Sequence, residues 1–334
     1  MSGPLRIGVL GAASIAPAAL LRPARRLPGV SVESVAARDP HRAQAFARRH
    51  ALPRFHQSYD ALLEDSDIDA VYIAVPNSLH LPWTLRALSA GKHVLCEKPL
   101  TCNADEAVQV AEAAARAGRV AAEAMAYRHH PLAARLVELT AQLGRLQHIE
   151  VFNCVPIFRR SDIRYQYDLG GGAAMDLGGY AVSLVRLLTG AEPEPTSVEV
   201  RQAGPGVDRW IAADLRLPDG TTAKVTCSLW SSDFLRSDAK IRGEAGWMKV
   251  YNPFAPHLFH CVTSQVDQVR RIRGRLRNGE STYACQLRAF VRAVREGGPV
   301  LTSATDAAQT LHVIDQMYRL AGLPVRHSIA RDTP

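Results

Sequence analysis

Two segments of the sequence carry residue types that could stabilise negative charge and transfer a proton. Glu97 and Lys98 follow the apolar run 93–96, and Pro99 comes directly after them. A lysine at a strand end can stabilise an alkoxide beside a nicotinamide, although a surface ion pair is the alternative. Asp176 and Tyr180 are spaced i and i+4, which places both on one helix face. A carboxylate and a phenol so placed form a proton-transfer pair, unless Tyr180 only fills a core.

A dinucleotide-binding turn is predicted after the first apolar run. The segment 11–16 reads GAASIA, which matches the fingerprint G-x-G-x-x-G/A at Gly11 and Ala16 but has Ala13 at the middle glycine. The extra methyl reduces the clearance for a pyrophosphate. A plain tight strand–helix connection is the alternative. The expected cofactor-binding backbone is that of Gly11, Ala12, Ala13, Ser14 and Ile15.

The end of the second apolar run bears on the choice between NADP and NAD. An acidic residue is expected there if the ribose 2′-hydroxyl is bound. The sequence instead has Ala37 followed by Arg38, whose guanidinium could pair with a 2′-phosphate. We therefore favour NADP over NAD. Alternatively, Arg38 is only solvated, and Asp39 caps the next helix and also reaches the ribose.

The first 126 residues alternate strands and helices, which predicts a parallel, doubly wound sheet. Asp39 and Pro40 have the residue types of an N-cap and a first helical position. Pro23 should kink the first helix. The strands are expected at 5–11, 30–37, 70–76, 93–99 and 120–126, and the helices at about 14–27, from 40, between 76 and 93, and at 104–117.

The remainder of the chain predicts a second, α+β domain whose strands follow one another, which favours an open, mostly antiparallel sheet. We place the NADP-binding domain at 1–126 and the substrate-binding and oligomerisation domain at 127–334, with the last helix as the element that could pack back on the first domain. The glycines at 170–172 are expected to let the backbone approach a flat ring. Strands are expected near 147–158, 196–202, 210–217, 223–230, 239–243 and 247–251, and helices at 132–143, 170–188, 283–296 and 305–321.

Composition excludes several classes of protein. The 334 residues contain no apolar run long enough for a membrane span and no recognisable signal peptide. Six scattered cysteines predict reduced thiols in a cytoplasmic protein, without a disulfide framework or a metal site. The net charge is +8, and the basic run 269–279 includes Arg270–Arg277. No aromatic residue interleaves these arginines, so we interpret the run as a surface hairpin rather than a nucleic-acid site.

Four motifs together resemble the glucose-fructose oxidoreductase/inositol dehydrogenase/MocA-type (Gfo/Idh/MocA) oxidoreductase family over nearly the full length. They are IGVLGAASIA, VYIAVPNSLH, AGKHVLCEKPL and GGGAAMDLGGYAV. The resemblance implies that Lys98 lies at the nicotinamide and that Tyr180 is the proton donor or acceptor, as in members with tyrosine at that place. It also implies that the cofactor crevice is lined by Glu97, Pro76, Asn77 and His80.

The resemblance leaves the substrate open. SDIRYQYDLGGGA is similar to the 3-ketoreductases of nucleotide-linked deoxysugars, which suggests Arg164 at the substrate, together with Asp176 and Tyr180. We expect an NADP-dependent oxidoreductase acting on a sugar or sugar-like diol, in which Lys98 lowers the pKa of Tyr180. The alternatives are a nucleotide-linked deoxysugar 3-ketoreductase, with Arg159, Arg160 or the basic run at the diphosphate, and a non-catalytic NADP-binding regulator. We further expect a small-molecule substrate, no nucleic-acid partner, and a homodimer or homotetramer.

Overall fold

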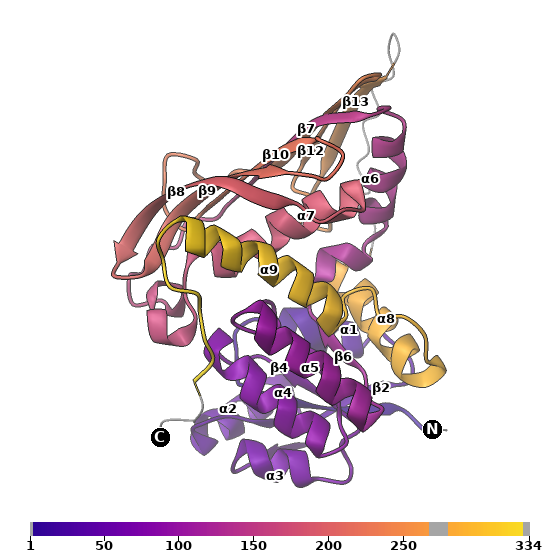
Figure 1. Cartoon of the computed structure of the whole chain (residues 1–334). Coiled ribbons are helices and arrows are strands. Elements are labelled where there is room, and N and C mark those ends of the chain that lie inside the picture. The colour runs from indigo at the N-terminus through magenta and orange to yellow at the C-terminus, as the bar shows by residue number, and fades with distance from the viewer. Residues whose placement is uncertain (1–2, 267–279, 330–334) are drawn as a thin grey trace. The chain divides into compact units, whose positions relative to one another are not determined.

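The computed structural model describes residues 3–266 and 280–329 and divides the chain into two compact units, each with its own sheet (Figure 1). The first unit extends to Ala126 and also includes 283–308 and the segment from 327 on. The second runs from Tyr127 to Thr282 and includes 309–326. The expected boundary at 126 therefore separates the units, but two C-terminal segments return to the first unit. The predicted basic hairpin lies outside the described residues.

The first unit contains a six-stranded, wholly parallel sheet of order β3-β2-β1-β4-β5-β6, as the sequence predicted. The order reverses between β1 and β4, so the carboxyl ends of these two strands flank the switch point where ligands bind in open α/β sheets. The strands are β1 (Leu5–Leu10), β2 (Val30–Ala36), β3 (Arg54–His56), β4 (Ala70–Ile73), β5 (His93–Cys96) and β6 (Ala121–Glu123).

The helices of the first unit connect these strands or follow them. Helix α5 has the predicted bounds, because Asn103 caps its start and Gly118 adopts the left-handed conformation at its end. Asp39 caps α2 as predicted, accepting from the His41 amide. The helices are α2 (Pro40–His50), α3 (Tyr59–Glu64), α4 (His80–Ser89), α5 (Ala104–Ala117) and α8 (Thr282–Glu296).

The first helix departs from the prediction of one helix to about residue 27. It consists of a π-helical turn, η1 (Pro17–Leu21), followed by the short α1 (Arg22–Ala24). Pro23 cannot donate an amide hydrogen bond and its ring crowds the preceding turn. The Arg22 amide reaches back to the carbonyl of Pro17, so the widened turn accommodates the proline where a kink was expected.

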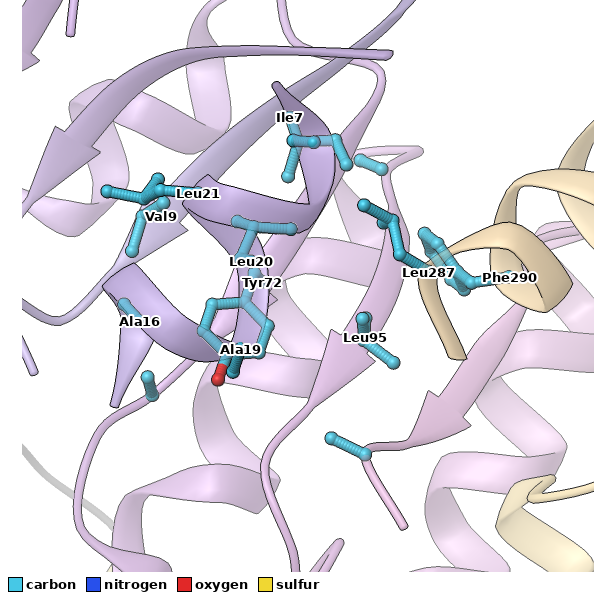
Figure 2. Close-up of a cluster of buried hydrophobic side chains, with 14 of the residues drawn as sticks. Ile7, Val9, Ala16, Ala19, Leu20, Leu21, Tyr72, Leu95, Leu287 and Phe290 are labelled. Atoms are coloured by element: carbon cyan, nitrogen blue, oxygen red, sulfur yellow. The ribbon is translucent and has the colours of Figure 1, made fainter. Parts of the chain in front are cut away.

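A hydrophobic cluster packs η1 against the strands β1, β4 and β5 (Figure 2). Val9 of β1, Tyr72 of β4 and Leu95 of β5 are at most 2 % exposed. Leu287 and Phe290 of α8 join this cluster although they lie almost 200 residues further along the chain than Leu95 (Figure 2). Helix α8 is therefore part of the first unit's core, which explains why the chain returns there.

The second unit contains a mixed, mostly antiparallel sheet of seven strands in the order β13-β12-β11-β7-β10-β9-β8. Among the described strands of this sheet, β7 and β10 are the pair that runs in parallel, so the predicted open, mostly antiparallel sheet is confirmed with a parallel pair at its centre. The strands are β7 (Leu146–Cys154), β8 (Glu194–Gly204), β9 (Val207–Arg216), β10 (Thr222–Ser228), β11 (Ser237–Gly243), β12 (Gly246–Tyr251) and β13 (Cys261–Val266).

Helix α7 (Gly179–Thr189) packs on β7 and β10 of this sheet. It is preceded by a second π-helical turn, η6 (Ala174–Gly178), whose Leu177 carbonyl accepts a hydrogen bond from the buried Asn153 amide at 3.2 Å. Helix α6 (Pro131–Ala141) and most of α9 (Ala304–Leu320) complete the unit. None of the helices in the described ranges combines the length and apolarity that a membrane span requires. The six cysteines all lie in the described residues and are not joined in disulfides.

Candidate functional site

The turn after β1 brings the backbone of two strand ends into close approach. Gly11 has φ +105°, and a Cβ there would overlap the carbonyl oxygen of Ala74. The Ala74 amide donates to Leu10 O at 2.8 Å, and the Gly11 amide donates to Ala36 O at 2.9 Å. Only glycine fits this position, so the first glycine of the predicted fingerprint is required by the fold itself.

The residues that follow Gly11 present backbone donors. Within the described part of the chain, no backbone hydrogen bond uses the amides of Ala12, Ala13 or Ser14. Successive free amides at the start of a helix attract phosphate oxygens. Ser14 is exposed, while Ala13 and Ile15 are partly buried against the core. Since the methyl group of Ala13 packs on the core, the expected loss of clearance for a pyrophosphate is reduced.

The end of β2 carries the residues that bear on the 2′-position of a ribose. Ala37 is buried, whereas Arg38 and Asp39 are exposed. Asp39 accepts from the His41 amide at 2.9 Å, so one of its oxygens is engaged in capping α2. At the edge of the sheet, Arg38 therefore offers a guanidinium where an acid would be expected for NAD.

Lys98 is the second residue beyond β5, at the same carboxyl edge. The Glu97 amide donates to Ile73 O at 2.9 Å, which continues the pairing with β4 one residue beyond β5. Lys98 and Glu97 are half-buried, and the Lys98–Pro99 peptide is cis. Tyr72 donates its hydroxyl to Glu97 at 2.5 Å. Burial, and then the neighbouring Glu97, raise the pKa of Tyr72 well above its ordinary value.

His80 lies behind this edge and does not line it. It is 1 % exposed. Its Nδ1 lies 2.6 Å from Pro99 O and its Nε2 lies 2.9 Å from Val75 O, so the ring bridges the loops that follow β4 and β5. Burial lowers the pKa of His80 to about 4, although the two carbonyls favour the charged ring. Pro76 and Asn77, in contrast, are half-buried on the β4 loop.

Glu123 is a residue of this edge that the sequence analysis did not single out. It is 4 % exposed at the end of β6 and accepts from the Leu100 amide at 3.0 Å. Thr302 donates its hydroxyl to Glu123 O at 2.8 Å. Glu123 thus fixes the turn just after Lys98 and Pro99. The signal was available, because a glutamate interrupts the apolar run 120–126.

In the second unit, Asp176 and Arg164 form an ion pair. Arg164 Nε donates to Asp176 Oδ2 at 2.8 Å, and its Nη1 lies 3.1 Å from Asp162 Oδ1. The Asp176 side chain is 14 % exposed. Burial opposes the charge of Arg164, but Asp176 and Asp162 outweigh it and raise the pKa of Arg164. Two of the predicted substrate-binding residues therefore meet in one pair.

Tyr180 stands at the start of α7 in a group of three aromatic rings. Its ring centroid lies 6.0 Å from that of Tyr127 and 5.4 Å from that of Phe254. Tyr127 is 1 % exposed and donates its hydroxyl to Ser183 at 3.0 Å. Tyr180 itself is half-buried, so one side of its ring is packed while part of the side chain remains accessible.

Two of the glycines before η6 border a buried polar network, and the approach of the 170–172 backbone to a flat ring stays a prediction. A Cβ on Gly171 would lie 2.7 Å from the carbonyl oxygens of Arg164 and Gln166. A Cβ on Gly172, which has φ +137°, would overlap the Asp208 carboxylate. The protein's own groups thus occupy the space beside both glycines.

Asp208 is the centre of that network. Its carboxylate accepts from the Ala174 amide at 2.7 Å, from Tyr318 at 2.9 Å and from Arg326 at 3.2 Å. Asp208, Tyr318 and Arg326 are each at most 1 % exposed. Arg326 also donates to Gly171 O at 3.0 Å. Burial raises the pKa of Asp208 to about 6, against the hydrogen bonds and the guanidinium that lower it. The network fixes the turn that carries Asp176.

Family models match both halves of the chain. An oxidoreductase family model with an NAD-binding Rossmann fold (GFO_IDH_MocA) matches residues 5–125, and the GFO/IDH/MocA C-terminal domain model matches 133–249. The chain belongs to the Gfo/Idh/MocA oxidoreductase family. The resemblance seen in the motifs is thereby confirmed, and the chain is an enzyme of the oxidoreductase class with an NAD(P)-binding Rossmann domain.

Individual members of the family are similar over most of the chain. The D-xylose 1-dehydrogenase (NADP(+)) 2 of Haloferax volcanii is 33 % identical, covering 95 % of this chain and 97 % of its own. The dTDP-3,4-didehydro-2,6-dideoxy-alpha-D-glucose 3-reductase of Streptomyces violaceoruber is 33 % identical, covering 88 % of this chain and 86 % of its own. The structure of a 3-ketoreductase from Actinomadura kijaniata, solved with NADP and TDP-benzene, has a TM-score of 0.85 at 30 % identity. The match covers 94 % of this chain and 96 % of that chain.

Proposed function

We propose that this Gfo/Idh/MocA enzyme is NADP-dependent and moves a hydride between the nicotinamide and a carbinol or carbonyl carbon of a sugar or sugar-like diol. One observation carries the proposal. The Gly11 turn, Arg38, the 75–77 loop and Lys98 all lie at the carboxyl edge of one parallel sheet, around its β1/β4 switch point. The free amides after Gly11 suit a pyrophosphate, and Arg38 suits a 2′-phosphate.

The proposed roles of the charged residues follow from their surroundings. NADP, when bound, accepts or supplies the hydride. Lys98, held by the Glu97 and Glu123 contacts on either side, stabilises negative charge on the substrate oxygen. Tyr180 donates or removes the hydroxyl proton, and its free pKa near 10 requires a cation to assist at neutral pH. Asp176, paired with Arg164, orients a second hydroxyl of the substrate.

The substrate class is supported by the family members. Relatives similar over at least 86 % of their own length are named as acting on D-xylose or on a dTDP-linked keto-deoxysugar. Both substrates present vicinal oxygens, for which a Tyr180 hydroxyl and an Asp176 carboxylate on one helix face are suited. The nucleotide-linked ketoreductase is therefore the second candidate function. Assembly into homodimers or homotetramers and a cytoplasmic location stay predictions.

Lys98→Met tests the catalytic assignment, with Lys92→Met as a matched control. Lys92 lies just before β5, and its ammonium donates to the carbonyls of Asp65 and Ile68, away from the carboxyl edge. Lys98→Met should retain NADPH binding and lose roughly a hundredfold or more in turnover. Near-normal turnover in Lys98→Met, measured by NADPH absorbance with keto-sugars, would remove the proposed role.

Tyr180→Phe tests the proton step separately. It preserves the aromatic packing with Tyr127 and Phe254 and removes only the hydroxyl. Turnover should fall by roughly 10²- to 10⁴-fold, and the remaining activity should lose its dependence on an ionising group in the pH profile. An unchanged pH profile at reduced rate would show that the proton comes from another group.

A further inference from the structure

Three aromatic side chains of the second unit gather at its surface. Phe158, Trp230 and Phe234 are 69 %, 44 % and 51 % exposed. Their ring centroids lie 5.4 to 6.3 Å apart, with interplanar angles of 63° to 85°. Clustered aromatic rings left open to solvent mark binding surfaces, since burying them is favourable. We call these three residues the aromatic cluster.

The parallel pairing at the centre of the second sheet creates this cluster. Because β7 and β10 run in the same direction, the loops that follow them leave the sheet at one edge. The Val155 amide donates to Ser228 O at 2.9 Å and the Ile157 amide donates to Leu229 O at 2.8 Å, so the two loops continue side by side. The cluster is therefore held by backbone pairing up to the residues next to Phe158 and Trp230.

The same loops are rich in arginine. Segments 155–166 and 229–236 contain four arginines and two aspartates, and both aspartates are paired with arginines. Arg159 and Arg160 are exposed. Burial raises the pKa of the Tyr165 hydroxyl, and the nearby positive charges of Arg160 and Arg209 partly offset that rise. Arg209 also donates to Trp230 O at 2.9 Å. Positive charge thus adjoins the aromatic cluster.

This surface is continuous with the proposed substrate residues. Tyr165 donates its hydroxyl to Ile157 O at 2.9 Å and approaches Leu229 O at 3.3 Å, so it bridges both loops. The preceding residue, Arg164, pairs with Asp176. One segment of chain therefore leads from the aromatic rings through the arginines to the ion pair at which a sugar is proposed to bind.

We propose that the aromatic cluster binds the base, and Arg159, Arg160 and Arg209 the diphosphate, of a nucleoside diphosphate-linked keto-sugar. This inference rests on the proposed oxidoreductase function and selects its second candidate substrate. Aromatic rings stack on any base, and guanidinium groups pair with phosphate oxygens. Since the cluster itself offers rings and few hydrogen-bonding groups, recognition should discriminate little between thymine and uracil.

The test is calorimetric titration of the full-length protein with dTDP and with UDP, in the presence of NADPH. The variants are Trp230→Ala and Arg160→Ala, with Trp247→Ala as control, because Trp247 of β12 is similarly exposed at 41 % but outside the cluster. Trp230→Ala should lower the affinity for both dTDP and UDP by roughly 10- to 100-fold. Arg160→Ala should weaken them by about 10-fold at low salt and less at high salt. Trp247→Ala should bind like the unaltered protein.

Three results would overturn the inference. The first is dTDP binding that is equal in Trp230→Ala and Trp247→Ala. The second is absence of dTDP binding in a protein that binds NADPH and turns over free sugars, which would leave the proposed function standing. The third is a change of oligomeric state in Trp230→Ala without a change in dTDP affinity, which would make the cluster a contact between copies. Loss of dTDP binding in Trp230→Ala in a protein without NADPH binding would support the nucleotide site and contradict the proposed function.

Discussion

Gly172→Ala should be among the most damaging single-methyl changes in the second unit. The residue has φ +137°, a conformation that costs a non-glycine residue about 1–3 kcal/mol. The new Cβ would also overlap the Asp208 carboxylate and lie 2.8 Å from the Tyr318 hydroxyl. Displacing that carboxylate breaks at least one buried, charged hydrogen bond, at a further cost of about 1.5–3 kcal/mol. The expected loss is about 2.5–6 kcal/mol of unfolding free energy.

Gly190→Ala is the matched control in the same unit. Gly190 also has positive φ, +66°, but a Cβ there would meet nothing within 4 Å. It should cost only the left-handed strain of about 1–2 kcal/mol. Urea unfolding followed by circular dichroism measures both variants. Losses that agree within about 0.5 kcal/mol would contradict this prediction, because the clash with the Asp208 network would then have no effect.

The other predictions concern acid stability and the substrate-side ion pair. His130 caps α6 by accepting from the Leu132 amide, and burial, with His260 and His257, lowers the pKa of His130 to about 4. Between pH 4 and 6.5 the unfolded chain therefore binds more protons at His130 than the folded protein does. The contribution of neutral His130 to the unfolding free energy, up to about 3 kcal/mol, is complete above pH 6.5 and is lost as the pH falls toward 4. His130→Asn keeps a cap acceptor and should flatten the pH dependence of the unfolding free energy; an unchanged slope would contradict this. Arg164→Lys keeps a charge but not the geometry of two simultaneous contacts, so kcat/KM should fall by roughly 10- to 100-fold with NADPH affinity unchanged; equal weakening of NADPH binding would contradict a substrate-side role.

The sequence predicted those parts of the fold whose signals are local. Helix α5 was predicted at 104 to about 117 and is observed at Ala104–Ala117, where Asn103 and Gly118 cap its ends, and the parallel sheet followed from the alternation of strands and helices. Strand β3 and helix α3 were missed because three and six residues are too few to show a period. The two π-helical turns were also missed: η6 has a tertiary partner, Asn153, and η1 accommodates Pro23 where a kink was expected.

The candidate site was predictable only in part, for the same reason. Lys98, Asp176 and Tyr180 were predicted because they stand at motif positions beside a strand end or on one helix face, and their catalytic roles stay predictions. The residues that hold them were not. Asp208 and Arg326 are 118 positions apart, and no spacing rule pairs them. His80 matched its motif, but only the structure shows that both its nitrogens face carbonyls.

The most direct test of the NADP assignment is a titration with NADPH and NADH by nicotinamide fluorescence, comparing Arg38→Ala with Arg49→Ala. Arg49 is exposed in the last turn of α2, so Arg49→Ala removes an equal positive charge at a place away from the carboxyl edge of the sheet. We expect a clear preference for NADPH that collapses, by roughly 10- to 100-fold, in Arg38→Ala alone, with NADH binding unchanged. Equal affinity for the two cofactors, or an equal loss in both variants, would contradict it.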